Sequence, residues 1–110
     1  MTVEFINTEA GLITFCQQIS DTPWLAVDTE FLREKTYYAQ LCLIQVATED
    51  RIACIDPLAI TDLTAILDLI YNPNITVVFH AARQDLELFY LLRGELPADV
   101  FDTQLAATVL

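Results

Sequence analysis

The segment from Trp24 to Phe31 constrains the fold of this chain most, because an apolar run ends there in two acidic residues. Leu25–Val27 has the composition of a buried strand. Side chains alternate faces along a strand, so Asp28 and Glu30 are expected on one face, with Cα atoms about 6.5 Å apart. Two like charges beside an apolar sheet repel each other and lose hydration. A divalent cation between them would offset that cost, so the segment predicts a Mg²⁺ or Mn²⁺ site with oxygen ligands.

The composition is that of one folded domain. The chain has 110 residues, of which 55% are hydrophobic, with only two Gly and four Pro, a composition that supports a core and argues against disorder. No apolar stretch approaches the ~20 residues of a membrane span, and the N-terminus lacks a secretory pattern. We therefore expect a cytoplasmic protein with no membrane partner.

The three cysteines are expected to be reduced core residues. Cys16, Cys42 and Cys54 are widely spaced and lie among aliphatic residues, which is typical of buried thiols. With a single histidine and no C-x-x-C pair, the sequence does not predict a zinc site.

The net charge limits how the chain can bind nucleic acid. Sixteen acidic residues against five basic ones give a formal net charge of −11, whereas affinity for a polyanion usually comes from Lys and Arg. Bound divalent cations invert the local field. A nuclease is therefore compatible with this charge if metals, a few local contacts or further segments provide the affinity for nucleic acid.

The order of expected elements predicts a mixed α/β sheet that begins antiparallel and continues with parallel strands. Helices are expected to begin at a cap on Asn7 or Thr8, at a cap on Thr61, near Ala81, and at a cap on Asp102. The first has an apolar stripe of Leu12, Phe15, Cys16 and Ile19, and the third is expected to end at Gly94. Strands are expected at 3–6, 24–28, 41–47, 52–55, 75–79 and 100–101, with a polar loop or hairpin arm at 32–40.

Asp85 is the third acidic residue with an unusual setting. On its helix it shares a face with Leu88, Phe89 and Leu92. A carboxylate in an inward stripe is costly unless it is paired or bound to metal. A helix N-terminus also favours an acidic residue, so the sequence leaves both interpretations open.

Other polar residues carry weaker signals. His80, the only histidine, is expected to be a packed or hydrogen-bonding residue rather than a metal ligand, and Asp102 an N-cap rather than a ligand. Asp62 and Asp68 are interpreted as solubility charges. The bases and aromatics at 33–38 suit either phosphate and base contacts or a solvated loop. No glycine-rich phosphate loop is present and Ser20 is the only serine, which argues against nucleophilic hydrolase chemistry.

At these residues the chain resembles the ribonuclease D family, of the DEDD superfamily of 3′–5′ exonucleases. Leu25–Phe31 resembles the first exonuclease motif and Val78–Glu87 the second. The stretches 37–45 and 55–58 resemble the intervening hairpin, and 100–107 the region after the second motif. The resemblance implies a ribonuclease-H-like α/β fold, a mixed sheet with flanking helices.

The resemblance also implies hydrolysis with two divalent ions, Mg²⁺ or Mn²⁺. Asp28 would bridge both ions, Glu30 would bind one ion and the terminal 3′-hydroxyl, and Asp85 would bind the second ion directly or through water. The expected substrate-binding residues are Thr29 and Phe31, which flank the ligands, together with His80. The expected substrates are RNA 3′ ends, notably transfer-RNA precursors, and the products nucleoside 5′-monophosphates.

One part of the family pattern is not found. The family has a third motif, with a Tyr that orients water and a fourth Asp, and helical RNA-binding domains follow it. Only eight residues follow Asp102. We therefore expect residues 1–110 to be a partial exonuclease domain, truncated before its final helices and nearly inactive alone.

The sequence leaves three alternatives open. The motifs do not distinguish RNA from DNA, since recognition of the 2′-hydroxyl depends on pocket geometry. A truncated chain could act as a non-catalytic module that associates with itself or a partner through exposed sheet or helix faces. A doubly wound signalling domain with Asp28 as acceptor would need more regular alternation than residues 41–55 permit.

Overall fold

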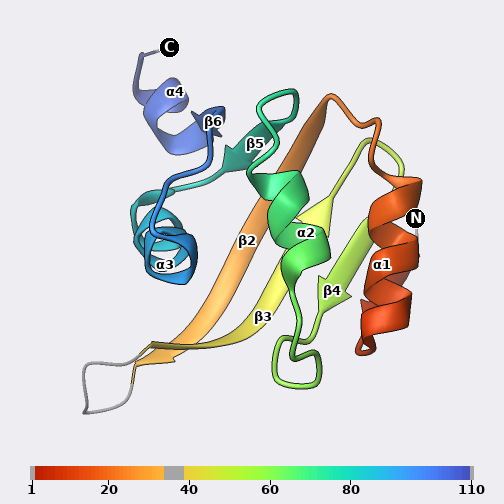
Figure 1. Cartoon of the computed structure of the whole chain (residues 1–110). Coiled ribbons are helices and arrows are strands. Elements are labelled where there is room, and N and C mark those ends of the chain that lie inside the picture. The colour runs from red at the N-terminus through yellow and green to blue at the C-terminus, as the bar shows by residue number, and fades with distance from the viewer. Residues whose placement is uncertain (1, 34–38, 110) are drawn as a thin grey trace.

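The computed structural model describes residues 2–33 and 39–109, which form a six-stranded mixed sheet in the order β1-β4-β3-β2-β5-β6 (Figure 1). The strands are β1 (Val3–Ile6), β2 (Trp24–Arg33), β3 (Ala39–Ala47), β4 (Ile52–Ile55), β5 (Thr76–Phe79) and β6 (Val100–Asp102). β2, β3 and β4 are antiparallel neighbours, whereas β1 pairs with β4, β5 with β2 and β6 with β5 in parallel. The expected mixed sheet is confirmed.

One face of the sheet is covered by helices. These are α1 (Glu9–Gln18), α2 (Thr64–Ile70) and α3 (Arg83–Arg93), while the short α4 (Thr103–Val109) follows β6 at the edge of the sheet (Figure 1). The core beneath them joins Leu12 of α1, Ile66 of α2 and Phe89 of α3 to strand residues such as Val27 and Phe79, all buried. None of the described helices is long and apolar enough to cross a bilayer.

α1 and α3 begin and end much as the sequence predicts. The Thr8 hydroxyl oxygen accepts a hydrogen bond from the N–H of Gly11 (3.0 Å), so the predicted cap of α1 is confirmed. α3 ends at Gly94, whose φ of 72° lies in the left-handed region that glycine adopts without a steric penalty.

The predicted start of α2 is wrong by two residues, because α2 begins at Thr64 rather than directly after Thr61. Asp62 Oδ1, not Thr61, accepts the hydrogen bond from the N–H of Thr64 (2.9 Å). Hydrogen bonds from the Thr64 side chain and then from its N–H lower the pKa of Asp62. Asp68 pairs with Arg93 of α3 (2.6 Å). Neither carboxylate is therefore only a solubility charge.

β2 is longer than its apolar run predicts. The strand was expected to end at Asp28 but continues to Arg33, because β3 pairs with it as far as Ala39 across a register shift between Glu30 and Phe31. Hydrogen bonding to a partner strand overrides the change to polar residues. Lys35, Tyr37 and Tyr38 lie outside the described residues.

The opposite face of the sheet is open within the described residues. Side chains alternate, so Leu25 and Val27 point to the helices while Ala26 and Asp28 point away. The open face contains the half-buried Ile52 and Cys54 and the exposed Phe5, at 82%. This sheet therefore presents an apolar surface that parallel and mixed sheets normally cover.

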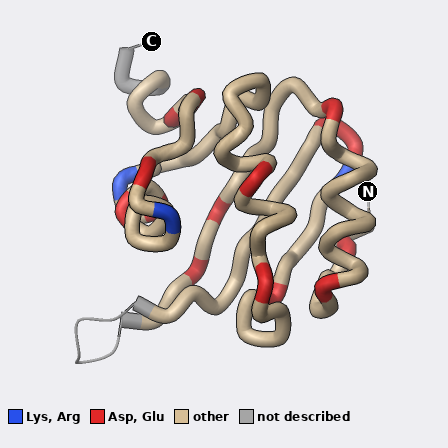
Figure 2. Tube along the Cα trace, in the orientation of Figure 1, with Lys and Arg blue, Asp and Glu red and all other residues tan. Residues whose placement is uncertain are grey.

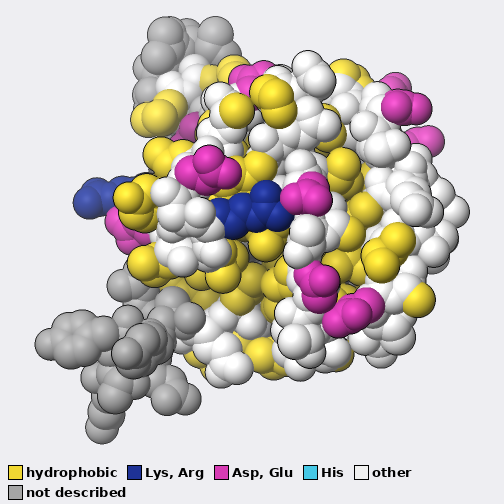
Figure 3. Space-filling model, in the orientation of Figure 1, with side chains coloured by type: hydrophobic (Ala, Val, Ile, Leu, Met, Phe, Trp, Pro, Cys, Tyr) yellow, Lys and Arg dark blue, Asp and Glu magenta, His cyan; other side chains and the backbone are white. Residues whose placement is uncertain are grey.

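Acidic positions are distributed over most of the chain trace (Figure 2). On the helix-covered face, acidic side chains are interspersed with apolar and uncharged ones, and few basic side chains are in view (Figure 3). The net charge of −11 is therefore dispersed over the surface.

Candidate active site

Asp28 and Glu30 lie together on the open face of β2. Both side chains are exposed, whereas Thr29 between them is buried on the opposite face. Strand alternation produces this arrangement, as the sequence predicts. Asp28 is paired in register with Gln45 of β3, and Glu30 with Leu43. Two acidic side chains thus project from neighbouring positions of one strand into solvent.

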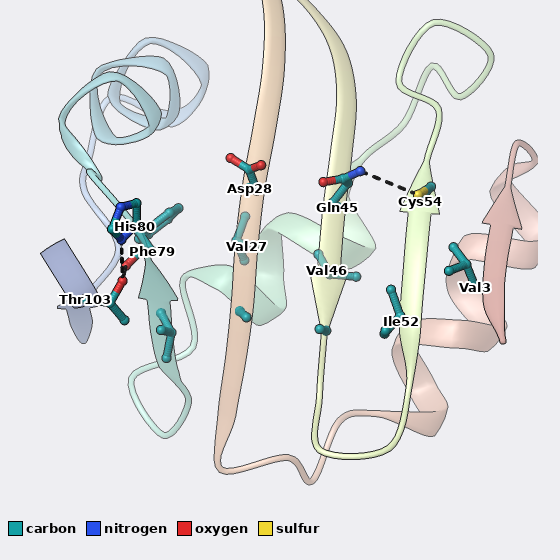
Figure 4. A pocket seen from close by; sticks show the side chains of 13 residues that line it. Val3, Val27, Asp28, Gln45, Val46, Ile52, Cys54, Phe79, His80 and Thr103 are labelled. Atoms are coloured by element: carbon teal, nitrogen blue, oxygen red, sulfur yellow. Dashed lines mark hydrogen bonds between the residues drawn. The ribbon is translucent and has the colours of Figure 1, made fainter. Parts of the chain in front are cut away.

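Asp28 lies at the rim of a shallow hollow on the open face. The hollow has a volume of about 520 Å³, and its polar side chains include Asp28, Gln45 and His80. In Figure 4, Gln45 lies beside Asp28 on the next strand, and His80 follows the end of β5 on the other side. Small and aliphatic residues form the floor, namely Val3, Ala26, Ala47, Ile52 and Val78. An apolar floor with a few polar groups at one rim is typical of a ligand site.

Asp85 approaches β2 from the helix-covered side. It lies in the first turn of α3 and is only 7% exposed. The Thr29 hydroxyl donates a hydrogen bond to Asp85 Oδ1, which satisfies a polar group that burial would otherwise make costly. Asp85 is thereby fixed to the residue between Asp28 and Glu30.

Burial raises the pKa of Asp85, and the hydrogen bond from Thr29 offsets part of that rise. The negative charge of Asp28 raises the pKa further, because like charges disfavour a second ionisation. The two carboxylates are therefore electrostatically coupled although they lie on different sides of the strand.

The described residues contain no group of three or more His, Cys, Asp or Glu side chains placed to hold one metal ion. Asp28 and Glu30 have the hard oxygen donors that Mg²⁺ and Mn²⁺ prefer, and both face solvent. Asp85 is turned to Thr29 instead. The structure brings the two strand acids together and leaves Asp85 behind them, so the predicted three-carboxylate metal site stays a prediction.

The three predicted substrate-binding residues lie in different settings. Thr29 is buried against Asp85, Phe31 is half-buried after the register shift, and His80 is exposed beside the hollow. His80 Nδ1 lies 2.8 Å from the Thr103 hydroxyl, which confirms His80 as a hydrogen-bonding residue. Substrate contacts by all three stay predictions.

One residue and one contact at this site were not predicted from the sequence. Gln45 is a polar residue between the buried Ile44 and Val46 of β3, a signal that marks a non-core face. The bond between Thr29 and Asp85 joins residues 56 positions apart, and no local pattern predicts it.

Comparison with known proteins decides the family. A family model described as 3′-5′ exonuclease matches residues 3–110. The chain belongs to the 3′–5′ exonuclease family. The expected resemblance to ribonuclease D is also confirmed. Ribonuclease D of Jannaschia sp. is 50% identical over 109 residues, covering 94% of this chain and 28% of the relative.

Solved structures of this exonuclease family have the same fold. The crystal structure of Escherichia coli RNase D, an exoribonuclease involved in structured RNA processing, matches with a TM-score of 0.90 and 42% identity, covering 97% of this chain and 28% of that one. The catalytic core of RRP6 from Trypanosoma brucei matches with a TM-score of 0.88 and 26% identity, covering 97% and 30%. The expected exonuclease-type mixed sheet with flanking helices is thereby confirmed, and the chain spans about 28% of the length of its curated relatives.

Proposed function

We propose that this chain carries the first and second exonuclease motifs of a metal-dependent 3′–5′ exoribonuclease. Its expected substrates are RNA 3′ ends in the cytoplasm, transfer-RNA precursors among them, and its products are nucleoside 5′-monophosphates. The observation that carries the proposal is the pair Asp28 and Glu30, both exposed on the open face of β2 with Asp28 at the rim of the hollow, in a chain that the exonuclease family model matches from residue 3 to residue 110.

Each residue has a distinct part in this proposal. Asp28 and Glu30 would hold divalent cations, which when bound activate water and stabilise the charge on the scissile phosphate. Their exposed carboxylates and oxygen donors suit Mg²⁺ or Mn²⁺. Asp85, whose pKa is raised by the charge of Asp28, would be the third carboxylate ligand. Phe31 would stack on the terminal nucleotide, and Thr29 would hold Asp85 in place.

The 110-residue chain alone should release little or no nucleotide. Its described residues offer no cluster of three metal ligands, and catalysis by positioned groups falls steeply when the geometry is incomplete. Its length is about 28% of that of its curated relatives. The activity is therefore proposed for a longer polypeptide that includes this sequence.

A chimera tests the proposal. Residues 3–109 of this chain would replace the matched part of Escherichia coli ribonuclease D, and release of nucleoside 5′-monophosphates from 3′-labelled RNA would be followed with Mg²⁺ or Mn²⁺. We expect release by the chimera, and a loss of about 100-fold or more with Asp28→Asn, because a ligand charge is removed. The variant should leave the fold intact.

Asp21→Asn is the matched control, because Asp21 is an exposed acid in the turn before β2. This substitution removes the same charge at a position away from the site. Near-normal release by the Asp28→Asn chimera would overturn the proposed role of Asp28. An oligonucleotide of the same sequence in DNA distinguishes an exoribonuclease from a DNA-directed exonuclease.

The open face supports a second candidate, self-association. Phe5 is 82% exposed and Val3 39% exposed, and both lie beside the apolar hollow. Burying this surface against a second copy would remove apolar area from water, although the charge of −11 opposes it. Sedimentation at low and high salt tests this candidate. A dimer that strengthens with salt and dissociates with Phe5→Ser would support it, and a monomer throughout would exclude it.

A further inference from the structure

The corner between β5 and α3 has an unusual backbone. Ala81 has a φ of 57°, in the left-handed region that a residue with a Cβ adopts only at a cost. Such a conformation persists when neighbouring groups hold it. The N–H of Ala81 donates to Asp102 Oδ1 (3.0 Å), and the N–H of Ala82 donates to Asp102 Oδ2 (2.8 Å). A carboxylate from β6, about 20 residues away in the sequence, therefore holds this corner.

Asp102 and its neighbour Thr103 connect the end of β6 to the end of β5 through hydrogen bonds. Asp102 Oδ1 also accepts from the N–H of Gln104 (2.9 Å), which confirms its predicted role as the cap of α4. The Thr103 hydroxyl donates to the carbonyl of Phe79 (3.2 Å) and lies 2.8 Å from His80 Nδ1. Asp102 and Thr103 thus contact the last residue of β5 and each of the next three.

This corner leads directly into the turn that carries Asp85. The helical hydrogen bond from the N–H of Leu86 to the carbonyl of Ala82 (2.8 Å) begins α3, so Asp85 lies one turn beyond the clamped residues. Asp85 meets Thr29 only if this first turn has the right position and direction. A cap for α4 needs one N–H acceptor, yet the Asp102 carboxylate accepts two further bonds from the corner.

We propose that Asp102 is a positioning residue, which holds the corner at Ala81 so that Asp85 reaches Thr29 beside the two strand acids. Its catalytic meaning rests on the proposed function, whereas its effect on Asp85 does not. Asp102 touches neither Asp85 nor Thr29. Its role is to fix the backbone from which Asp85 projects.

The test uses isotopically labelled chain without metal. Asp102→Ala removes the side-chain bonds to the N–H groups of Ala81 and Ala82, and Asp102→Asn keeps one acceptor oxygen. Asp99→Asn is the matched control, because Asp99 lies on the same segment and binds the Thr76 hydroxyl instead (2.7 Å). Two quantities are measured, the amide hydrogen exchange of Ala81 and Ala82 and the nuclear Overhauser effect between the Thr29 methyl and the Asp85 β-protons.

With Asp102→Ala we expect exchange at both amides to rise about tenfold or more, while β2 and β3 keep their protection. The Overhauser effect between Thr29 and Asp85 should disappear. Asp102→Asn should give a smaller change in the same direction, and Asp99→Asn none. A role confined to capping α4 would leave the Overhauser effect intact. If Asp102→Ala fails to fold, Asp102→Asn decides: unchanged exchange and an unchanged Overhauser effect would overturn the proposal.

A second arm adds Mn²⁺, which broadens nearby resonances. In the wild-type chain we expect broadening at both Asp28 and Asp85, and in Asp102→Ala at Asp28 alone. Absence of broadening in the wild-type chain would contradict the proposed function, while the metal-free measurements still decide the role of Asp102. Equal broadening of Asp85 in both chains would overturn the positioning role.

Discussion

At the scale of single residues, the carboxyl group of Asp85 has a stability cost because it is buried behind the proposed cation site. It is 7% exposed, and burial raises its pKa. A raised pKa in the folded state means that ionisation opposes folding: stability from this group is fully present below the unfolded pKa and is lost as the pH rises through the folded one. At neutral pH the charged form therefore destabilises the fold.

Asp85→Asn should accordingly raise the free energy of unfolding at pH 7, by about 1 kcal/mol, because the amide oxygen still accepts from Thr29 and no charge is buried. Thermal unfolding of the variant and the wild type, measured between pH 3.5 and pH 7, checks this. The difference in Tm should shrink towards acidic pH, where the wild-type carboxyl is protonated.

Removing one negative charge from a chain of net charge −11 could itself stabilise it. Asp21→Asn controls for this, since Asp21 is exposed and should give a smaller gain. A Tm difference for Asp85→Asn that grows towards acidic pH would contradict the account of Asp85.

Ala81 gives a second prediction at this scale. Its φ of 57° is costly for alanine and not for glycine, so Ala81→Gly should raise the free energy of unfolding by up to about 1 kcal/mol. Urea denaturation of the variant and the wild type measures this change in the free energy of unfolding. Ala82→Gly is the control, because Ala82 has a right-handed φ of −67° and glycine should destabilise there. Equal destabilisation by both glycines would show that the corner is unstrained.

At the scale of elements, Arg51 connects β1, α1 and the turn before β4. Its guanidinium donates to both oxygens of Glu4 (3.0 and 2.6 Å) and to Gln18 Oε1 (2.6 Å). It also lies 4.8 Å from the centre of the Phe15 ring. The hydrogen bond from Arg51 lowers the pKa of Glu4, so this pairing stabilises the fold at neutral pH and is lost as the pH falls through the folded pKa of Glu4.

Arg51→Ala should therefore lower the free energy of unfolding by about 1 kcal/mol at pH 7, since a bidentate pair and a ring contact are lost from a partly exposed site. Arg51→Lys should recover only part of it, because an ammonium cannot make the paired contacts. Arg83→Ala is the control, as Arg83 is exposed and lies 3.9 Å from Glu87. Equal losses in both alanine variants, measured by urea denaturation, would contradict a linking role for Arg51.

Most element positions followed from local signals, and the exceptions have identifiable causes. The stripe of Leu12, Phe15 and Cys16 and the glycine after α3 predicted two helices well. β2 continued past its apolar run because its length depends on pairing with β3. α2 begins two residues later than expected, because Asp62 rather than Thr61 accepts the N–H of Thr64, a choice between adjacent acceptors that propensity alone does not make.

At the scale of the whole molecule, the sequence predicted that Asp28 and Glu30 share one face of a strand. It did not predict where Asp85 lies relative to them. Strand alternation suffices to place Asp28 and Glu30 together. The position of Asp85 depends on the corner that Asp102 holds and on the bond from Thr29, both of which join distant segments. The open face depends on which helices are present to cover the sheet, and alternation within a strand carries no information about that.

We propose that the strand acids Asp28 and Glu30 form a divalent-cation site on the open face, with Asp85 on the opposite side of β2. A Mn²⁺ titration of the labelled 110-residue chain, followed by line broadening of its amide resonances, tests this most directly. We expect saturable broadening centred on Asp28 and Glu30, lost in Asp28→Asn and retained in Asp21→Asn. Broadening spread evenly over the acidic surface, or centred away from β2, would contradict it.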